Sequence, residues 1–102
     1  MQRYDYDVTK DFLFLYEDNY IEKYAFSIDY SSHVKIELSN DFNILSVAIR
    51  HASKELNINM ELLVKPDNIE LFVDKNDDNK LELSLEITSL NRKYTRVLKS
   101  KN

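Results

Sequence analysis

Two histidines and the carboxylates near them are the residues of this sequence that could do acid–base chemistry. His51 and Glu55 stand four positions apart in a stretch with helical apolar spacing, so on a helix their side chains would touch. A histidine oriented by a carboxylate is typical of a general base, but an ordinary surface pair has the same spacing. Because no nucleophile stands beside the pair, we expect no catalytic residue and no enzyme. His33 shares no metal-ligand spacing with His51, so we expect no metal site.

The segment from Asp74 to Asn79 has part of a calcium-loop pattern. Oxygen-bearing side chains occupy its first, third and fifth positions, but position twelve is Leu85, where the pattern needs a bidentate glutamate. Strand-like sequence flanks the segment in place of helices. We therefore predict a solvated hairpin turn without a bound cation, and the sequence indicates no other cofactor.

Charge is distributed unevenly along the 102 residues. The formal net charge is -4, yet residues 91–102 carry five cations and no acid. On a helix these cations would form a stripe suited to nucleic-acid phosphates, although cations also favour the negative end of a helix without binding anything. The possible nucleic-acid-binding residues are Arg92, Lys93, Arg96 and Lys99.

The first thirty residues have the opposite character. They hold seven acids, three bases and six of the seven tyrosines. Tyrosine is enriched in protein interfaces because it offers a broad contact area and a polar tip. It also lines the edges of cores with its hydroxyl in water, which we expect of Tyr24 and Tyr30. The predicted partner-binding residues are Tyr16, Asp18, Tyr20 and Glu22.

One main helix is predicted to support these residues. Apolar residues within 41–57 recur at steps of three and four, which is typical of a helix with one buried face. Period-two alternation predicts strands over 24–30, 34–38, 60–64, 69–73 and 81–87. The stretch 9–24 fits either a helix or a hairpin, and a short helix is expected from Asn91. The prediction is therefore one α+β domain over residues 1–102, with two layers: a mostly antiparallel sheet of about five strands and the 41–57 helix packed on it.

Missing residue types exclude several function classes. The chain has no glycine, so it has no Walker A loop, no Rossmann fingerprint and no nucleophile elbow. It has no cysteine, which removes disulfides, thiolate nucleophiles and cysteine-based zinc sites. The longest apolar run has five residues, which is too short to span a bilayer. We therefore expect a soluble cytoplasmic protein that binds no membrane.

Three functions were compatible with these residues. We favour a small protein-binding inhibitor, antidote or adaptor, of the size and charge of toxin-immunity or phage anti-defence proteins, that presents an acidic tyrosine-bearing surface to a basic partner. The first alternative is a nucleic-acid-binding regulator that uses the basic C-terminal segment. The second is an enzyme built on His51 and Glu55. A homodimer through a sheet edge is compatible with each of them.

Overall fold

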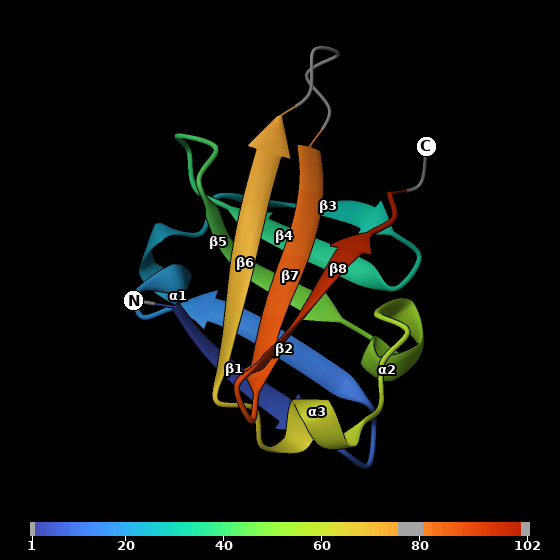
Figure 1. Ribbon diagram of the computed structural model, residues 1–102. Coiled ribbons are helices and arrows are strands. Elements are labelled where there is room, and N and C mark those ends of the chain that lie inside the picture. The colour runs from blue at the N-terminus through green and yellow to red at the C-terminus, as the bar shows by residue number, and fades with distance from the viewer. Residues whose placement is uncertain (1, 76–80, 101–102) are drawn as a thin grey trace.

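Two antiparallel sheets account for most of the chain and face each other as two layers (Figure 1). The computed structural model describes residues 2–75 and 81–100, and within these residues the chain forms eight strands and three short helices. The three-stranded sheet lies in front in Figure 1 and runs across the five-stranded sheet behind it.

The five-stranded sheet has the strand order β1-β2-β5-β4-β3, and every neighbouring pair is antiparallel. Its strands are β1 (Gln2–Asp7), β2 (Phe12–Glu17), β3 (Phe26–Ser31), β4 (Val34–Leu38) and β5 (Ile44–Ile49). β5 pairs with β2 on one side and with β4 on the other. The β1–β2 hairpin and the β3–β4 hairpin are therefore joined into one sheet through β5.

The three-stranded sheet is a meander, in which each strand pairs with the next strand in the sequence. It consists of β6 (Asn68–Lys75), β7 (Leu81–Ser89) and β8 (Arg92–Leu98). Leu90 and Asn91 form the β7–β8 turn with φ angles of 51° and 64°. Two positive φ angles are those of a type I′ turn, whose twist matches that of the flanking strands. The three helices, α1 (Tyr20–Lys23), α2 (Ala52–Glu55) and α3 (Glu61–Val64), are a single turn each.

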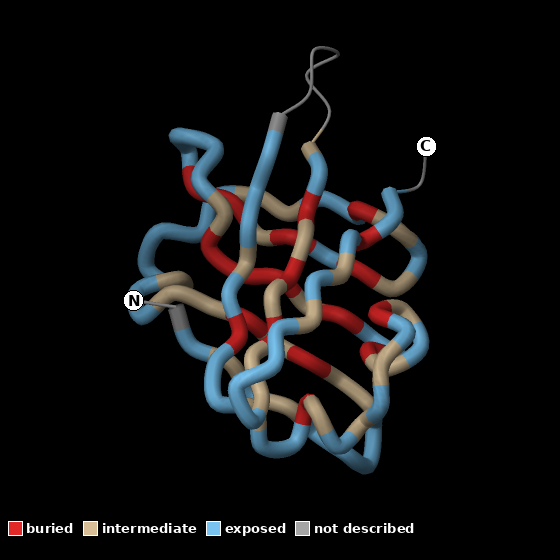
Figure 2. Tube along the Cα trace, in the orientation of Figure 1, coloured by how far each residue is buried: buried red, intermediate tan, exposed pale blue. Residues whose placement is uncertain are grey.

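The core lies between the two sheets, because strand alternation points one set of side chains from each sheet inward. Figure 2 shows the buried residues gathered along these facing strands. Buried side chains from the two sheets include Leu13, Leu15, Ile36, Val47, Leu83, Leu85 and Ile87. α2 and α3 follow β5 and add Ala52, Leu56 and Leu63 to the same cluster.

The predicted helix over 41–57 is wrong. Residues 44–49 form β5, and helical structure is limited to the single turn of α2. Phe42, expected on the buried helix face, is 70% exposed. The second layer that covers the five-stranded sheet is therefore another sheet, and the single-sheet arrangement with a packed helix is not what the chain adopts.

Two further elements differ from the expectation. The predicted strand over 60–64 is the helix α3, in which Leu63 is buried and Val64 is 49% exposed. The amide of Glu61 donates to the side-chain oxygen of Asn59 at 3.0 Å, which favours a helical turn at this point. The predicted helix from Asn91 is the strand β8. The strand at 34–38 is confirmed with its predicted ends, and those at 24–30, 69–73 and 81–87 are confirmed with shifted ends.

The stretch 9–24 combines both alternatives. It contains the strand β2, which pairs with β1 as a hairpin, and then the helical turn α1. The predicted loop over 75–80 and the incomplete calcium pattern lie mostly outside the described residues.

Candidate functional site

An aromatic row runs along the outer face of the five-stranded sheet. Leu13 and Leu15 of β2 are buried against the other sheet, so alternate residues of β2 point to the opposite face. Tyr20, the first residue of α1, adds a ring from the segment that follows β2. We call this set the aromatic row, and it consists of Phe12, Phe14, Tyr16 and Tyr20.

The rings of the aromatic row touch one another in succession. The centroids of Phe12 and Phe14 are 6.4 Å apart, and those of Phe14 and Tyr16 are 5.2 Å apart, with the rings nearly parallel in both pairs. The ring of Tyr20 lies 5.5 Å from Phe14 and 5.5 Å from Tyr16. These separations are those of favourable aromatic pairs. All four side chains remain partly exposed, so the row is a continuous apolar strip that another molecule can cover.

Neighbouring strands border the aromatic row with two different kinds of side chain. β1 places Arg3, Asp5 and Asp7 directly opposite its three strand residues. β5 places Ser46 and Ala48 on its other side. Ser46 is buried and its hydroxyl donates to the Glu37 carboxylate at 2.6 Å, so the row has a charged border along β1 and small side chains along β5.

A pocket of about 420 Å³ lies at the Phe12 end of the aromatic row. Phe12 and Ala48 form part of its wall, together with Lys35 of β4. His33 and Arg50 also line it, and Arg50 is held there by a hydrogen bond of 2.6 Å from its guanidinium to the carbonyl of Ser32. The row therefore ends beside a hollow lined by Lys35, Arg50 and Asp29, while its border along β1 is mainly acidic.

Carboxylates outnumber cations on the outer face as a whole. At the outward strand positions they are Asp5, Asp7, Asp29 and Glu37, against Arg3 and Lys35. Partial desolvation and a hydrogen bond to the Asp5 carboxylate raise the pKa of the Tyr16 hydroxyl, so it stays protonated at neutral pH. The face thus combines exposed aromatic surface with negative charge, which favours cationic partners.

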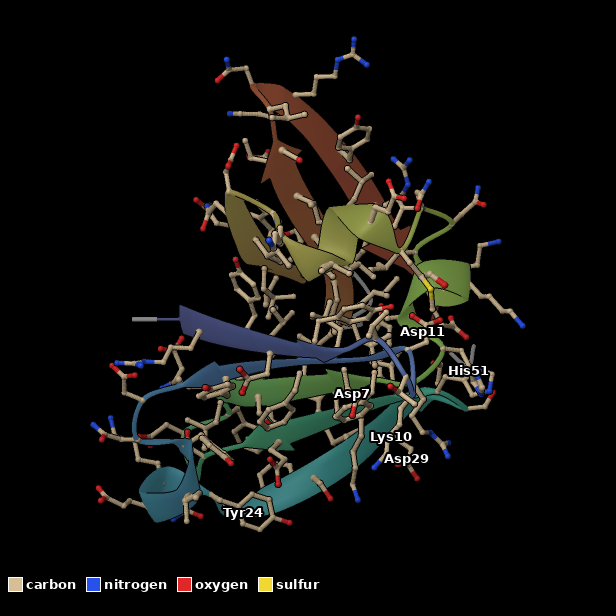
Figure 3. All side chains as sticks on the ribbon, turned by 90° about the horizontal axis from the view of Figure 1, so that it is seen from below. Asp7, Lys10, Asp11, Tyr24, Asp29 and His51 are labelled. Atoms are coloured by element: carbon tan, nitrogen blue, oxygen red, sulfur yellow. The ribbon has the colours of Figure 1, made fainter. Side chains whose placement is uncertain are left out.

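The outer face is open to solvent along most of its length. In Figure 3 it points downward, with Asp29 from β3 and Tyr24 after α1 on its open side. α1 lies at one end of this face, and among the described elements none covers the rest.

The structure brings two of the predicted partner-binding residues into one cluster. The rings of Tyr16 and Tyr20 contact each other at a tilted angle. Asp18 forms an ion pair with Arg3, and Glu22 is exposed on α1. The sequence reasoning missed Phe12 and Phe14 as site residues. Their signal was the period-two spacing with Tyr16, which points all three side chains to one side of a strand.

The other tyrosines have separate roles. Tyr30 is 8% exposed, and its hydroxyl donates to the carbonyl of Leu98 at 3.0 Å. Tyr4 and Tyr6 pack against the core from the edge strand β1. Tyr24, expected at the core edge, is 46% exposed. The acidic, tyrosine-rich first third of the chain is therefore divided between the core and the outer face.

The histidine that contacts Glu55 is His33, whereas the sequence predicted His51. Glu55 contacts Nδ1 of His33 at 2.6 Å, and the ring of His33 lies against that of His51 with centroids 4.8 Å apart. His51 is exposed and adopts a left-handed backbone conformation just before α2. The predicted pairing of His51 with Glu55 is therefore wrong, since the fold carries the His33 turn to Glu55 from a hairpin 22 residues earlier.

Near the two histidines, Asp11 of the β1–β2 turn is the carboxylate that accepts the most hydrogen bonds. It accepts hydrogen bonds from the Tyr6 hydroxyl at 2.5 Å and from the hydroxyl of Ser53 at 2.7 Å. Burial opposes ionisation of Asp11, but these hydrogen bonds and the positive charge that His51 can carry outweigh it and hold the pKa of Asp11 below its usual range. The same environment raises the pKa of Tyr6 through burial and the neighbouring negative charge. These contacts fasten α2 to the β1–β2 turn, which is a structural role.

The basic C-terminal segment does not form a helical stripe. Because β8 is a strand, Arg92 and Arg96 point to the face opposite that of Lys93. Lys93 pairs with Glu86 of β7 at 3.6 Å, and Lys99 lies just past the end of the strand. The four predicted phosphate contacts are thus divided between the two faces of an edge strand.

Within residues 2–75 and 81–100, no three histidine, aspartate or glutamate side chains are arranged to hold a metal ion.

The chain matches no family model, no curated protein and no solved structure. None of the described helices has the length and apolar composition needed to cross a bilayer. Function must therefore be inferred from the outer face itself.

Proposed function

We propose that this chain is a non-catalytic protein-binding module whose outer sheet face covers a basic surface of another protein. The observation that carries the proposal is the aromatic row, four partly exposed rings in contact with one another and bordered by carboxylates on an open sheet. Stacked aromatic side chains supply contact area with little loss of conformational entropy on binding. By occupying a partner's basic site, the module acts as an inhibitor, antidote or adaptor.

Charge favours a protein partner over nucleic acid at this face. Aromatic side chains on an open sheet can also stack nucleobases. Such sites need a positively charged groove along the backbone, whereas this face carries four carboxylates against two cations at its outward strand positions. A basic protein surface complements the same charges, and guanidinium and ammonium groups are attracted to the faces of aromatic rings.

The test is a comparison of two aromatic changes. The double variant Tyr16→Ala, Tyr20→Ala removes half of the aromatic row, and the control Phe72→Ala removes a 47% exposed ring from the three-stranded sheet. Proteins captured from the source cells by each immobilised chain are identified by mass spectrometry, and the affinity for the identified partner is then measured. Interface hot spots contribute about 2 kcal/mol or more, so the double variant should lose at least about 30-fold in affinity and the control less than about twofold.

Salt tests the electrostatic part of the proposal, and a charge reversal separates the two classes of partner. The association rate with a basic protein should fall as salt rises from 50 to 300 mM, because screening weakens attraction between the two surfaces. A partner that binds the double variant as tightly as the unchanged chain would contradict the proposal. A nucleic acid that copurifies and is lost on Arg92→Glu, Arg96→Glu would favour the C-terminal segment as the binding site.

A further inference from the structure

A groove opens between the two sheets where β5 begins and β6 ends. Its volume is about 560 Å³, within the range of roughly 300–1,000 Å³ of sites that bind ligands. Ile44 and Val47 line it from one sheet, and Val73 and Leu81 line it from the other. Glu17 is its one ionisable lining residue. Asn43 and Ser46 also line it, so the groove is a slot of mixed polarity in which apolar side chains from the two sheets face each other.

Phe42 stands at this groove with most of its ring in water. The side chain is 70% exposed, and Val73 nearby is 46% exposed. The backbone of Phe42 has a φ of 63°, a left-handed conformation that is uncommon for a bulky residue. Its amide donates to the carbonyl of Ser39 at 3.0 Å, and its ring lies edge-on against Phe26 at 5.4 Å. The turn thus holds an aromatic ring in place without burying it.

A second, acidic hollow adjoins the groove. It has a volume of about 700 Å³ and shares Glu17, Asn43, Ile44 and Leu45 with the groove, so the two lie side by side. Its carboxylates are Glu17, Asp18, Glu22 and Asp41, and Lys23 is its single cation. Asp18 is engaged by Arg3, whereas Asp41 and Glu22 are exposed and make no ion pair within the described part of the chain. The net charge of this lining is -3.

We propose that the groove and the hollow together bind an extended segment of a partner protein, one that carries a large apolar side chain close to a lysine or arginine. The inference rests on the proposed function, since it assumes a protein-binding module, but it concerns a surface separate from the aromatic row. The apolar side chain enters the slot beside Phe42 and Val73, where its burial is favourable. The cation lies in the hollow beside Asp41 and Glu22.

Because the groove and the hollow are adjacent, the apolar residue and the cation of the partner must be close to each other in its sequence. An extended chain advances about 3.3 Å per residue, so a cation one to three residues from the apolar side chain lies within about 10 Å of it. The negative charge of the hollow disfavours acidic segments, and a purely apolar segment brings no cation to Glu22 and Asp41. The matching sequence is therefore an apolar anchor with a basic residue within three positions.

A random library of 12-residue peptides displayed on phage tests this inference. Selection on the immobilised full chain should enrich peptides with Phe, Leu, Ile, Met or Trp within three positions of Lys or Arg. Binding of the synthesised peptides is then measured by fluorescence anisotropy. Affinity should fall at least fivefold with Phe42→Ala and at least fivefold with Glu22→Gln, Asp41→Asn. Phe72→Ala and Asp29→Asn, which alter exposed residues outside both hollows, should change it less than twofold.

Several results would overturn the inference. They are the absence of any enriched peptide, enrichment of peptides without cations, and affinity that both groove variants leave unchanged. Peptides lost only with Tyr16→Ala, Tyr20→Ala would place binding on the outer face, which overturns the groove and supports the proposed function. Thermal unfolding of each variant shows whether it is folded, and two variants with different chemistry prevent one unfolded protein from deciding the outcome.

Discussion

Replacing Asp11 by asparagine should destabilise the fold at neutral pH. The Asp11 carboxylate accepts hydrogen bonds from the Tyr6 hydroxyl and from both the amide and the hydroxyl of Ser53, while its carbonyl accepts from the amide of Ala52 at 2.9 Å. Asp11 also has a φ of 51°, a conformation that asparagine tolerates well. Asp11→Asn therefore removes the charge without adding backbone strain.

The expected loss follows from these contacts. A hydrogen bond to a charged group contributes about 1.5–3 kcal/mol. Asparagine keeps one acceptor oxygen, and the site is partly exposed, so we expect a loss of about 2 kcal/mol at pH 7. For a domain of this size that corresponds to a decrease of roughly 10 °C in Tm. Urea unfolding followed by circular dichroism measures the difference directly.

The pH dependence gives a second, independent check. Because the pKa of Asp11 is lowered in the folded state, the ionised carboxylate stabilises the fold above the ordinary aspartate range. That contribution is lost as the pH falls through the folded-state pKa, so the difference between the unchanged chain and Asp11→Asn should shrink at pH 3. Asp29→Asn is the control and should cost less than about 0.5 kcal/mol. A loss below 0.5 kcal/mol at pH 7, or one equally large at pH 3, would refute the role given to Asp11.

Two other changes should alter stability measurably. Tyr30→Phe removes a hydroxyl that donates to the carbonyl of Leu98 and accepts from the amide of Leu83, so it should cost about 1–3 kcal/mol in urea unfolding; a loss under 0.5 kcal/mol would show that these buried groups find other partners. Leucine at a φ of 51° is strained, so Leu90→Asn combined with Asn91→Gly, the residues preferred in a type I′ turn, should raise stability by about 1 kcal/mol; an unchanged or lower Tm would contradict this reasoning.

Strands were predictable where polar and apolar residues alternate strictly. In β4, Val34, Ile36 and Leu38 are buried, while Lys35 and Glu37 point outward. One face of β4 meets the core and the other meets solvent, so the period of two is visible in the sequence. The first and last residues of such strands were less predictable, because bulges and turns shift them by a residue or two.

The central strand β5 was not predictable from the same rule. Ile44, Leu45, Val47, Ala48 and Ile49 are apolar on both sides of the strand. Such a run also matches helical spacing, and the neighbouring Phe42, Ala52 and Leu56 extend the match. The β-branched residues favoured a strand, but a short apolar run does not by itself distinguish the two structures.

The site was predictable only in part. Tyr16 and Tyr20 stand four positions apart and meet, although they do so across the junction between a strand and a helical turn. The contact between His33 and Glu55 depends on the whole arrangement of the five-stranded sheet, and no local pattern indicates it. The cations of β8 were predicted to lie on a helix, because the turn at Leu90 lacks the glycine or aspartate that usually marks a hairpin.

The position of β5 between the two hairpins has a consequence for synthesis of the chain. Leu13 of β2 pairs with Ile49, which is 36 residues later. At translation rates of about 5–20 residues per second, β2 waits roughly 2–7 s on the ribosome before its partner emerges. During this time one edge of β2 has no strand partner, and Leu13 and Leu15 stay uncovered until the three-stranded sheet is synthesised, so nascent chains of this protein are expected to engage chaperones until β7 has left the exit tunnel.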